Sequence, residues 1–225
     1  MSNRKLYEQQ LHQLNTSLIE MAQSAEKLIN QTITVLKTGD DELAKLTIKQ
    51  DDIVDLQQLE IEKQCALLIA HQQPIASDLR FIISVIKIIT DIERIADQCS
   101  DICQYSLKLS NKALHENINY ERHIERMAIA ARDMLKHAIE SFINKDTEAI
   151  KTICKSDDKI DQAFWKIWQE IIEEMKGDNQ FIENGIQYIM IIKYLERIAD
   201  HITNIAEWTY YSLTGKYIIH EQIKE

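Results

Sequence analysis

The chain alternates between long stretches with helical periodicity and short polar breaks. Apolar residues recur every three or four positions, which predicts helices because one face of a helix repeats every 3.6 residues. The breaks fall at residues 37–40, 72–78, 110–119, 144–146 and 176–179. They predict six helices of about 25 to 33 residues, each roughly 40 to 50 Å long. Because the connections are short, consecutive helices are expected to run antiparallel.

The second half of the chain repeats the first. At an offset of 106, the segment Asp51-Asp52-x-x-Asp55 reappears as Asp157-Asp158-x-x-Asp161. After the second turn the offset falls to 103, and Glu93-Arg-Ile-Ala-Asp97 reappears as Glu196-Arg-Ile-Ala-Asp200. We therefore predict an all-α protein of two tandem antiparallel three-helix bundles, similar in architecture to spectrin repeats. The expected units are residues 1–112, residues 113–215 and a C-terminal tail of residues 216–225.

Composition agrees with long helices and excludes several classes of protein. Only 4 glycines and 1 proline occur in 225 residues, too few for the turns of a β-sandwich or barrel. The glycines are also too scattered for a phosphate-binding loop or a dinucleotide-binding turn. The net charge of −10 argues against nucleic acid or anionic lipid as a partner, since both bind basic surfaces.

Cysteine placement and hydropathy indicate the compartment. Cys65, Cys99, Cys103 and Cys154 form no C-x-x-C pair and lie within helical patterns, which is typical of buried free thiols in a reducing environment. The polar start MSNRKLYEQQLHQL does not resemble a signal peptide. The most apolar stretch, residues 79–89, is too short to span a bilayer. We expect a cytoplasmic protein with no direct membrane insertion.

The third predicted helix has an apolar stripe and an acidic row on opposite faces. Glu93, Asp97 and Asp101 lie one turn apart, and like charges at this spacing destabilise a helix. The sixth helix places Glu196, Asp200, Asn204 and Glu207 in one sector in the same way. The expected apolar stripe of the third helix consists of Phe81, Ile88, Ile92, Ile95, Cys99 and Ile102.

Two further acidic pairs are expected to face these rows. In an antiparallel hairpin, residues equidistant from the turn lie level. Asp51 with Asp97, and Asp55 with Glu93, are both centred on Pro74. Asp157 with Asp200, and Asp161 with Glu196, are both centred within residues 177–179. Each bundle is therefore predicted to bring four carboxylates together.

Four neighbouring carboxylates require protonation or a cation. Their hard oxygens suit magnesium, calcium, manganese or iron, and zinc is possible. A solvated acidic face, with Arg94 and Arg197 as partners, is the alternative interpretation. His201 lies off the acidic sector and is more typical of a structural histidine. The candidate metal ligands are Asp51, Asp55, Glu93, Asp97, Asp101, Asp157, Asp161, Glu196 and Asp200.

Other side chains are assigned roles in packing and turns. Asp40 or Asp41 is a candidate N-cap of the second helix, and Ser77 or Asp78 of the third. Asp78 and Arg80 are expected to pair or cap at the Pro74 turn. Trp165, Trp168 and Trp208 are expected to be core or interface aromatics.

In these features the chain resembles the PhoU family, the accessory proteins of phosphate-specific transport. The resemblance runs from about Leu6 to Thr214 and includes the tandem three-helix units. It also includes Gln-Gln-Pro-x-Ala-x-Asp-Leu-Arg at residues 72–80, the Glu-Arg-Ile-x-Asp segment in each half, and the ending Arg197-Ile-Ala-Asp-His-Ile-Thr-Asn-Ile-Ala-Glu-Trp208.

The resemblance implies a cytoplasmic helical protein that often forms a homodimer. It also implies a negative regulator of the phosphate-starvation response, acting between a phosphate ABC transporter and a sensor histidine kinase. Some members of the family bind metal clusters through paired acidic motifs, which match Asp51/Asp55 with Glu93/Asp97 and Asp157/Asp161 with Glu196/Asp200. The replacement of Asp101 by Asn204 in the second half predicts a second site that binds metal more weakly or holds fewer ions.

Three other functions remain open from the sequence. A carboxylate-bridged metalloenzyme would also place acidic residues on bundle helices, usually with an inward Glu-x-x-His motif. That motif is missing from the acidic rows, where Ala96 follows Glu93 and Ala199 follows Glu196 at the histidine position. A helical accessory protein of another phosphate or ion transporter is a second alternative. A third is a helical protein whose acidic faces serve only partner docking or solubility. We expect a protein that is not an enzyme.

Overall fold

The computed structural model describes residues 3–110 and 118–218 of the chain. The described residues form helices, with short turns between them, and contain no strand. The elements are α1 (Asn3–Thr38), α2 (Asp41–Gln72), α3 (Ala76–Ser106), α4 (Asn119–Asn144), α5 (Thr147–Gly177), the short 3-10 helix η1 (Asn179–Phe181) and α6 (Ile182–Thr214).

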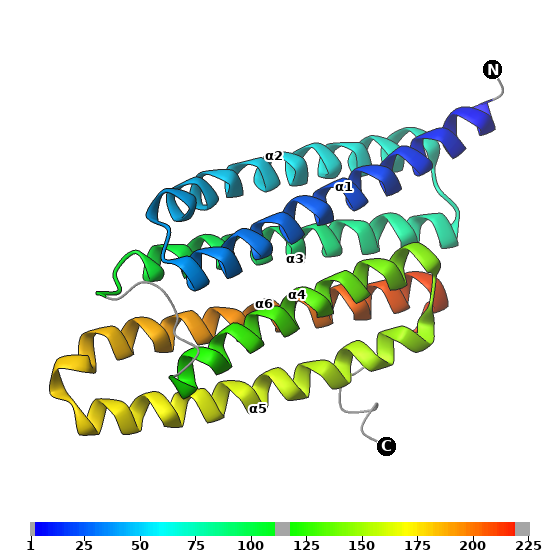
Figure 1. Cartoon of the computed structure of the whole chain (residues 1–225). Coiled ribbons are helices and arrows are strands. Elements are labelled where there is room, and N and C mark those ends of the chain that lie inside the picture. Colours follow the sequence, from blue (N-terminus) through cyan, green and yellow to red (C-terminus); the bar gives the residue numbers. More distant parts are fainter. Residues whose placement is uncertain (1–2, 111–117, 219–225) are drawn as a thin grey trace.

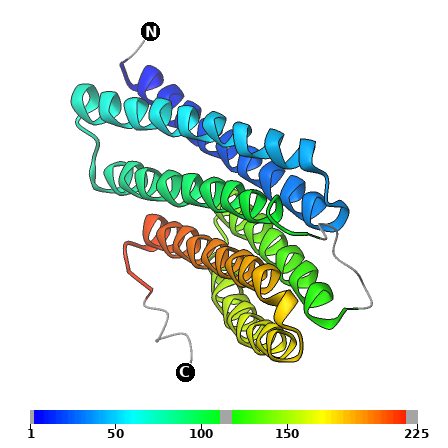
Figure 2. The same ribbon diagram turned by 90° about the vertical axis from the view of Figure 1, so that its left-hand side faces the viewer.

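The helices form two antiparallel three-helix bundles that lie side by side (Figure 1). α2, α3, α6 and α5 follow one another across the molecule, while α1 and α4 cover the other side of this layer (Figure 2). α3 packs against α6, and α1 against α4, so both join the two bundles. The prediction of an all-α tandem repeat is confirmed. The proposed boundary at residues 112–113, and most of the proposed tail, lie outside the described residues.

The core is continuous across the two bundles. One connected set of buried apolar side chains extends from Leu14 in α1 to Ala206 in α6. The predicted stripe of α3 is buried, with Phe81 only partly so. Ile82, Val85 and Ile89 are also fully buried, because α3 packs against α6 as well as against α1 and α2. Each bundle thus completes the core of the other.

Equivalent aspartates begin the second helix of each bundle. Asp40 accepts hydrogen bonds from the backbone N–H groups of Glu42 and Leu43, both at 3.0 Å. Asp146 does the same for Glu148 and Ala149. These bonds satisfy N–H groups that have no partner within the helix. Asp40, one of the two predicted candidates, is therefore the cap of α2.

The turn before α3 differs from its prediction. α3 begins at Ala76, and its N-cap residue Ile75 makes no side-chain capping bond. Asp78 lies within the first turn and accepts a hydrogen bond of 2.9 Å from the hydroxyl of Tyr7 in α1. Arg80 donates to the backbone oxygen of Ser212 in α6, at 3.1 Å. Asp78 therefore links α3 to α1, and Arg80 links α3 to α6. The sequence around the turn could not indicate these contacts with distant helices.

Other packing predictions have mixed outcomes. All four cysteines are buried and free. Trp168 and Trp208 are partly buried against the core. Trp165 is 61% exposed, so of its two predicted positions, core or interface, the core is excluded. None of the described helices combines the length and the apolar composition that crossing a bilayer requires.

Candidate metal centre

The hairpin of α2 and α3 brings three predicted carboxylates together. One oxygen each from Asp55, Glu93 and Asp97 lies within 4.8 Å of the other two. Glu93 and Asp97 are one turn apart in α3, and Asp55 faces them from α2. Their approach follows from the antiparallel hairpin, whose turn after Gln72 contains Pro74.

A second group of carboxylates extends the cluster along α2. Oxygens of Asp51, Asp52 and Asp55 also lie within 4.8 Å of one another, so Asp55 belongs to both groups. Asp51 accepts a hydrogen bond from the buried Ser100 of α3. Asp52 is not among the candidate ligands predicted from the sequence. Its presence in the repeated Asp-Asp-x-x-Asp segment was the signal that could have identified it.

Four of the five carboxylates of the cluster are partly buried, and Asp52 is exposed. Burial raises the pKa of Asp55, and the nearby carboxylates of Asp97 and Asp52 raise it further. Burial, followed by the charge of Asp97, likewise raises the pKa of Glu93. Burial also raises the pKa of Asp51, against the lowering effect of its Ser100 bond. The site therefore favours a proton or a cation over a full set of bare charges.

Arg94 is the cation that the chain itself supplies. Its Nη1 lies 2.7 Å from Oδ2 of Asp97, and its Nε lies 3.2 Å from Oε2 of Glu93. The arginine side chain is 50% exposed, so solvent screens these contacts. Oδ1 of Asp55 is buried and has no hydrogen-bond partner within the described chain. Arg94 thus offsets one side of the cluster and leaves this oxygen available.

The donor set fits a hard or borderline metal ion. The ligands would be carboxylate oxygens on two rigid helices, with solvent on one side to supply water ligands. Asp55 belongs to both groups of carboxylates, so it would be a ligand of a metal ion held by either group. Where a metal binds, it would replace the partial neutralisation that Arg94 provides.

Asp101 lies outside both carboxylate groups. It forms a hydrogen bond with Tyr194 of α6, and burial together with the charge of Asp97 raises its pKa. Its side chain therefore links the two bundles at the α3–α6 interface.

The second repeat is less compact at the equivalent place. Asp157 is buried in α5, and the nearby charges of Asp200 and Asp161 add to burial in raising the pKa of Glu196. In the part of the chain that the structure describes, no three carboxylates of this second set have oxygens that all lie within 4.8 Å of one another. The predicted second set is therefore assembled only loosely.

Asn204 and His201 face the other bundle. Oδ1 of Asp91 in α3 lies 3.0 Å from Nδ2 of Asn204 and 2.9 Å from Nδ1 of His201. Asp91 and His201 expose only 13% and 18% of their side chains. Asp91, which is not among the functional residues predicted from the sequence, thus holds α6 against α3. Asn204 is an interface residue, as is its counterpart Asp101.

The fold and the site define a class: tandem helical repeats that present carboxylates on the faces of their hairpins. Both repeats match the PhoU domain, over residues 18–106 and 124–209. The chain therefore belongs to the PhoU family.

Relatives and solved structures from the same family match this chain over nearly its full length. A phosphate-specific transport system accessory protein PhoU homolog from Clostridium acetobutylicum is 35% identical over 216 residues, covering 96% of this chain and 97% of the relative. The crystal structure of the phosphate transport system regulatory protein PhoU from Streptococcus pneumoniae has a TM-score of 0.87 and 32% identity, covering 95% of this chain and 99% of its own. PhoU from Pseudomonas aeruginosa also has a TM-score of 0.87, with 27% identity, covering 93% and 100% respectively.

Proposed function

We propose that this protein is a non-enzymatic regulator of phosphate uptake and a negative regulator of the phosphate-starvation response. It would act in the cytoplasm and link a phosphate-specific ABC transporter to a sensor histidine kinase. The observation that supports this most is the match of both repeats to the PhoU domain, together with full-length relatives named as accessory proteins of phosphate-specific transport. We further propose that the protein acts as a homodimer.

Deletion of the gene tests the regulatory role. In high phosphate, the deletion strain should express phosphate-starvation genes that the parent strain represses, and the intact gene supplied in trans should restore repression. Normal repression in the deletion strain would reject the role. The test separates this function from that of an accessory protein serving a different transporter, which would leave these genes unaffected.

We also propose that the acidic faces bind metal ions such as iron, zinc, manganese or magnesium. In the first repeat the ligands would be Asp51, Asp52, Asp55, Glu93 and Asp97, and the weaker second site would use Asp157, Asp161, Glu196 and Asp200. A bound cation would neutralise carboxylates that otherwise repel one another across each hairpin, and so stabilise the relative position of its helices.

Metal content provides the corresponding measurement. Protein stripped with a chelator and dialysed against iron, zinc or manganese should retain metal, and Asp55→Asn/Asp97→Asn should retain clearly less. Asp133→Asn is the matched control, since Asp133 is exposed and pairs with Arg132 away from the site. Equal metal content in all three proteins would reject the first-repeat site without affecting the regulatory proposal. Metal-dependent turnover would favour the metalloenzyme alternative.

A further inference from the structure

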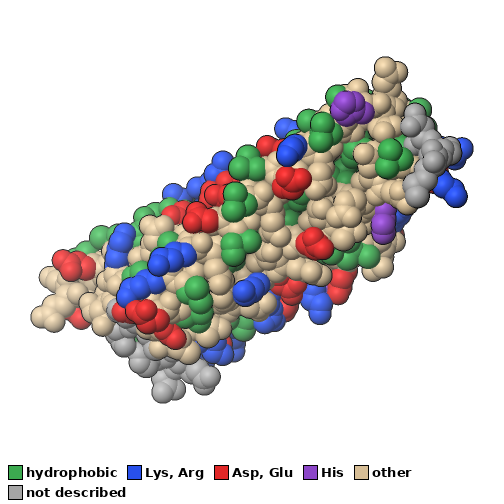
Figure 3. All heavy atoms as spheres, turned by 90° about the horizontal axis from the view of Figure 1, so that it is seen from above, with side chains coloured by type: hydrophobic (Ala, Val, Ile, Leu, Met, Phe, Trp, Pro, Cys, Tyr) green, Lys and Arg blue, Asp and Glu red, His purple; other side chains and the backbone are tan. Residues whose placement is uncertain are grey.

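The outward edge of α2 exposes apolar side chains that the described chain leaves uncovered. Leu46, Ile53, Leu56 and Leu67 expose 46%, 50%, 67% and 48% of their surface. Figure 3 views the molecule from above, the side on which α2 lies in Figure 1, and shows hydrophobic side chains between charged ones along this surface. Exposed apolar side chains that gather on one face of a helix, rather than being scattered around it, are typical of an interaction surface.

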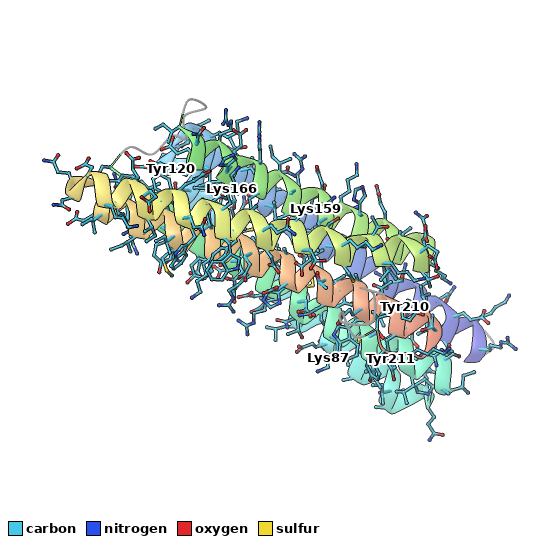
Figure 4. The ribbon with its side chains drawn as sticks, turned by 90° about the horizontal axis from the view of Figure 1, so that it is seen from below. Lys87, Tyr120, Lys159, Lys166, Tyr210 and Tyr211 are labelled. Carbon is cyan, nitrogen blue, oxygen red and sulfur yellow. The ribbon has the colours of Figure 1, made fainter. Side chains whose placement is uncertain are left out.

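The internal repeat shows that the fold does not need this edge to be apolar. The equivalent positions in α5, at the offset of 106, are Thr152, Lys159, Gln162 and Glu173. Lys159 and Lys166 lie along α5 in Figure 4, and both are exposed. Because α5 forms the same kind of hairpin with a polar edge, the apolar residues of α2 serve something other than the folding of one chain.

The spacing of the edge is that of a coiled-coil seam. Its residues are separated alternately by three and four positions, which is the heptad pattern of two helices that pack along their length. Ile53 and Leu56 lie near the middle of this edge, and a charged residue lies on each side of them. In order, the edge consists of Leu46, Lys49, Ile53, Leu56, Glu60, Lys63 and Leu67.

We propose that a second copy of this chain packs its α2 antiparallel against this edge, around a two-fold axis between Ile53 and Leu56. In this register Ile53 lies opposite the partner's Leu56, and Lys49 lies opposite the partner's Glu60. Leu46 is covered by the aliphatic stem of the partner's Lys63. The axis repeats each contact, so the interface is self-complementary and closes as a dimer.

Charge complementarity favours a second copy of the chain on this edge, with its α2 antiparallel. In the antiparallel register, both Lys49–Glu60 contacts join opposite charges. A parallel pairing of the same edge would place lysine against lysine and glutamate against glutamate, which is unfavourable. Lys49 and Glu60 are exposed, and neither forms an ion pair with another described residue. Both are therefore available to a second copy.

Charge reversal tests the surface. This inference takes from the proposed function only that two copies associate, and sedimentation velocity over a dilution series measures that association directly. The wild-type protein should approach twice the chain mass of 26.3 kDa as concentration rises. Lys49→Glu and Glu60→Lys should each weaken the dimer about tenfold, because each creates two like-charge contacts. The double variant Lys49→Glu/Glu60→Lys should restore wild-type association.

A matched control exists in the second repeat. Lys155→Glu changes the residue equivalent to Lys49 on α5 and should leave the dimer unchanged. A wild-type protein that stays monomeric would overturn both the dimer and this surface. A dimer that neither single reversal weakens, or that the double variant does not restore, would overturn the surface alone. The phosphate response of the deletion strain is independent of all these outcomes.

Discussion

Asp91 of α3 accepts a hydrogen bond from Asn204 of α6, with 3.0 Å between the two atoms. At the repeat offset of 103, Asp91 corresponds to Tyr194, and Asp101 corresponds to Asn204. Asp101 and Tyr194 are themselves hydrogen-bonded. The two contacts are therefore equivalent, related by the internal symmetry that packs α3 antiparallel against α6. The repeat has kept the positions of the contacts while their chemistry has diverged.

Removing Asp91 should weaken the junction between the bundles. Asp91→Ala leaves the partly buried His201 and Asn204 without their shared acceptor, and should lower the free energy of unfolding by about 1 to 3 kcal/mol. Urea denaturation monitored by circular dichroism measures the effect. Asp133→Ala, at an exposed position of α4, is the control and should change stability by less than about 0.5 kcal/mol. Equal effects of the two variants would contradict the role of Asp91.

Replacing Lys145 by glycine should stabilise the protein. Lys145 has φ of 56° in the turn before α5, where the equivalent residue in the first repeat is Gly39, with φ of 64°. A left-handed conformation costs a residue with a Cβ about 1 kcal/mol, a cost that glycine avoids. Lys145→Gly should therefore raise the urea midpoint, and Gly39→Ala should lower it. A lower midpoint for Lys145→Gly would contradict this account of the turn.

The metal-free protein should lose stability as pH rises through the titration of its acidic cluster. The folded pKa of Asp51, Asp55 and Glu93 is raised chiefly by burial, so the folded chain holds these protons to higher pH than the unfolded chain. Between the ordinary unfolded pKa, near 4, and the raised folded pKa, the free energy of unfolding therefore falls with increasing pH. The contribution is fully present only below the unfolded value.

Comparison of variants isolates that contribution. Asp55→Asn removes one titrating group and relieves repulsion, so its urea midpoint should fall less steeply across this pH range than that of the wild-type protein. Both proteins should be measured after chelation. Parallel pH profiles would contradict the coupling of these carboxylates to stability.

The four cysteines should be unreactive in the folded protein. Burial raises the pKa of the Cys65 and Cys154 thiols to about 12, and that of Cys103 to about 11. At pH 8 almost none of these thiols is ionised, and alkylation requires the thiolate. Labelling with iodoacetamide, followed by mass spectrometry, should therefore be slow without denaturant and complete in urea. Rapid labelling of the folded chain would show that these helices open locally.

The approach of Asp55 to Glu93 and Asp97 could be predicted from sequence because it depends on local geometry. Residues equidistant from the turn of an antiparallel hairpin lie level, and the turn is marked by the only proline. The place of Asp101 could not be predicted in this way. It shares the phase of Glu93 and Asp97, but at its height α6 packs against α3 and Tyr194 forms the hydrogen bond.

By itself, the sequence determined the helices, their order, the internal repeat and the carboxylates that meet within one hairpin. These features depend on periodicity, turn residues and spacing along a single chain segment. Only the tertiary structure decided that α3 and α6 share one core, and that Asp91, Asp101, His201 and Asn204 lie at the junction. Such contacts join residues about a hundred positions apart, and a helical wheel gives no information about which face a distant helix will cover.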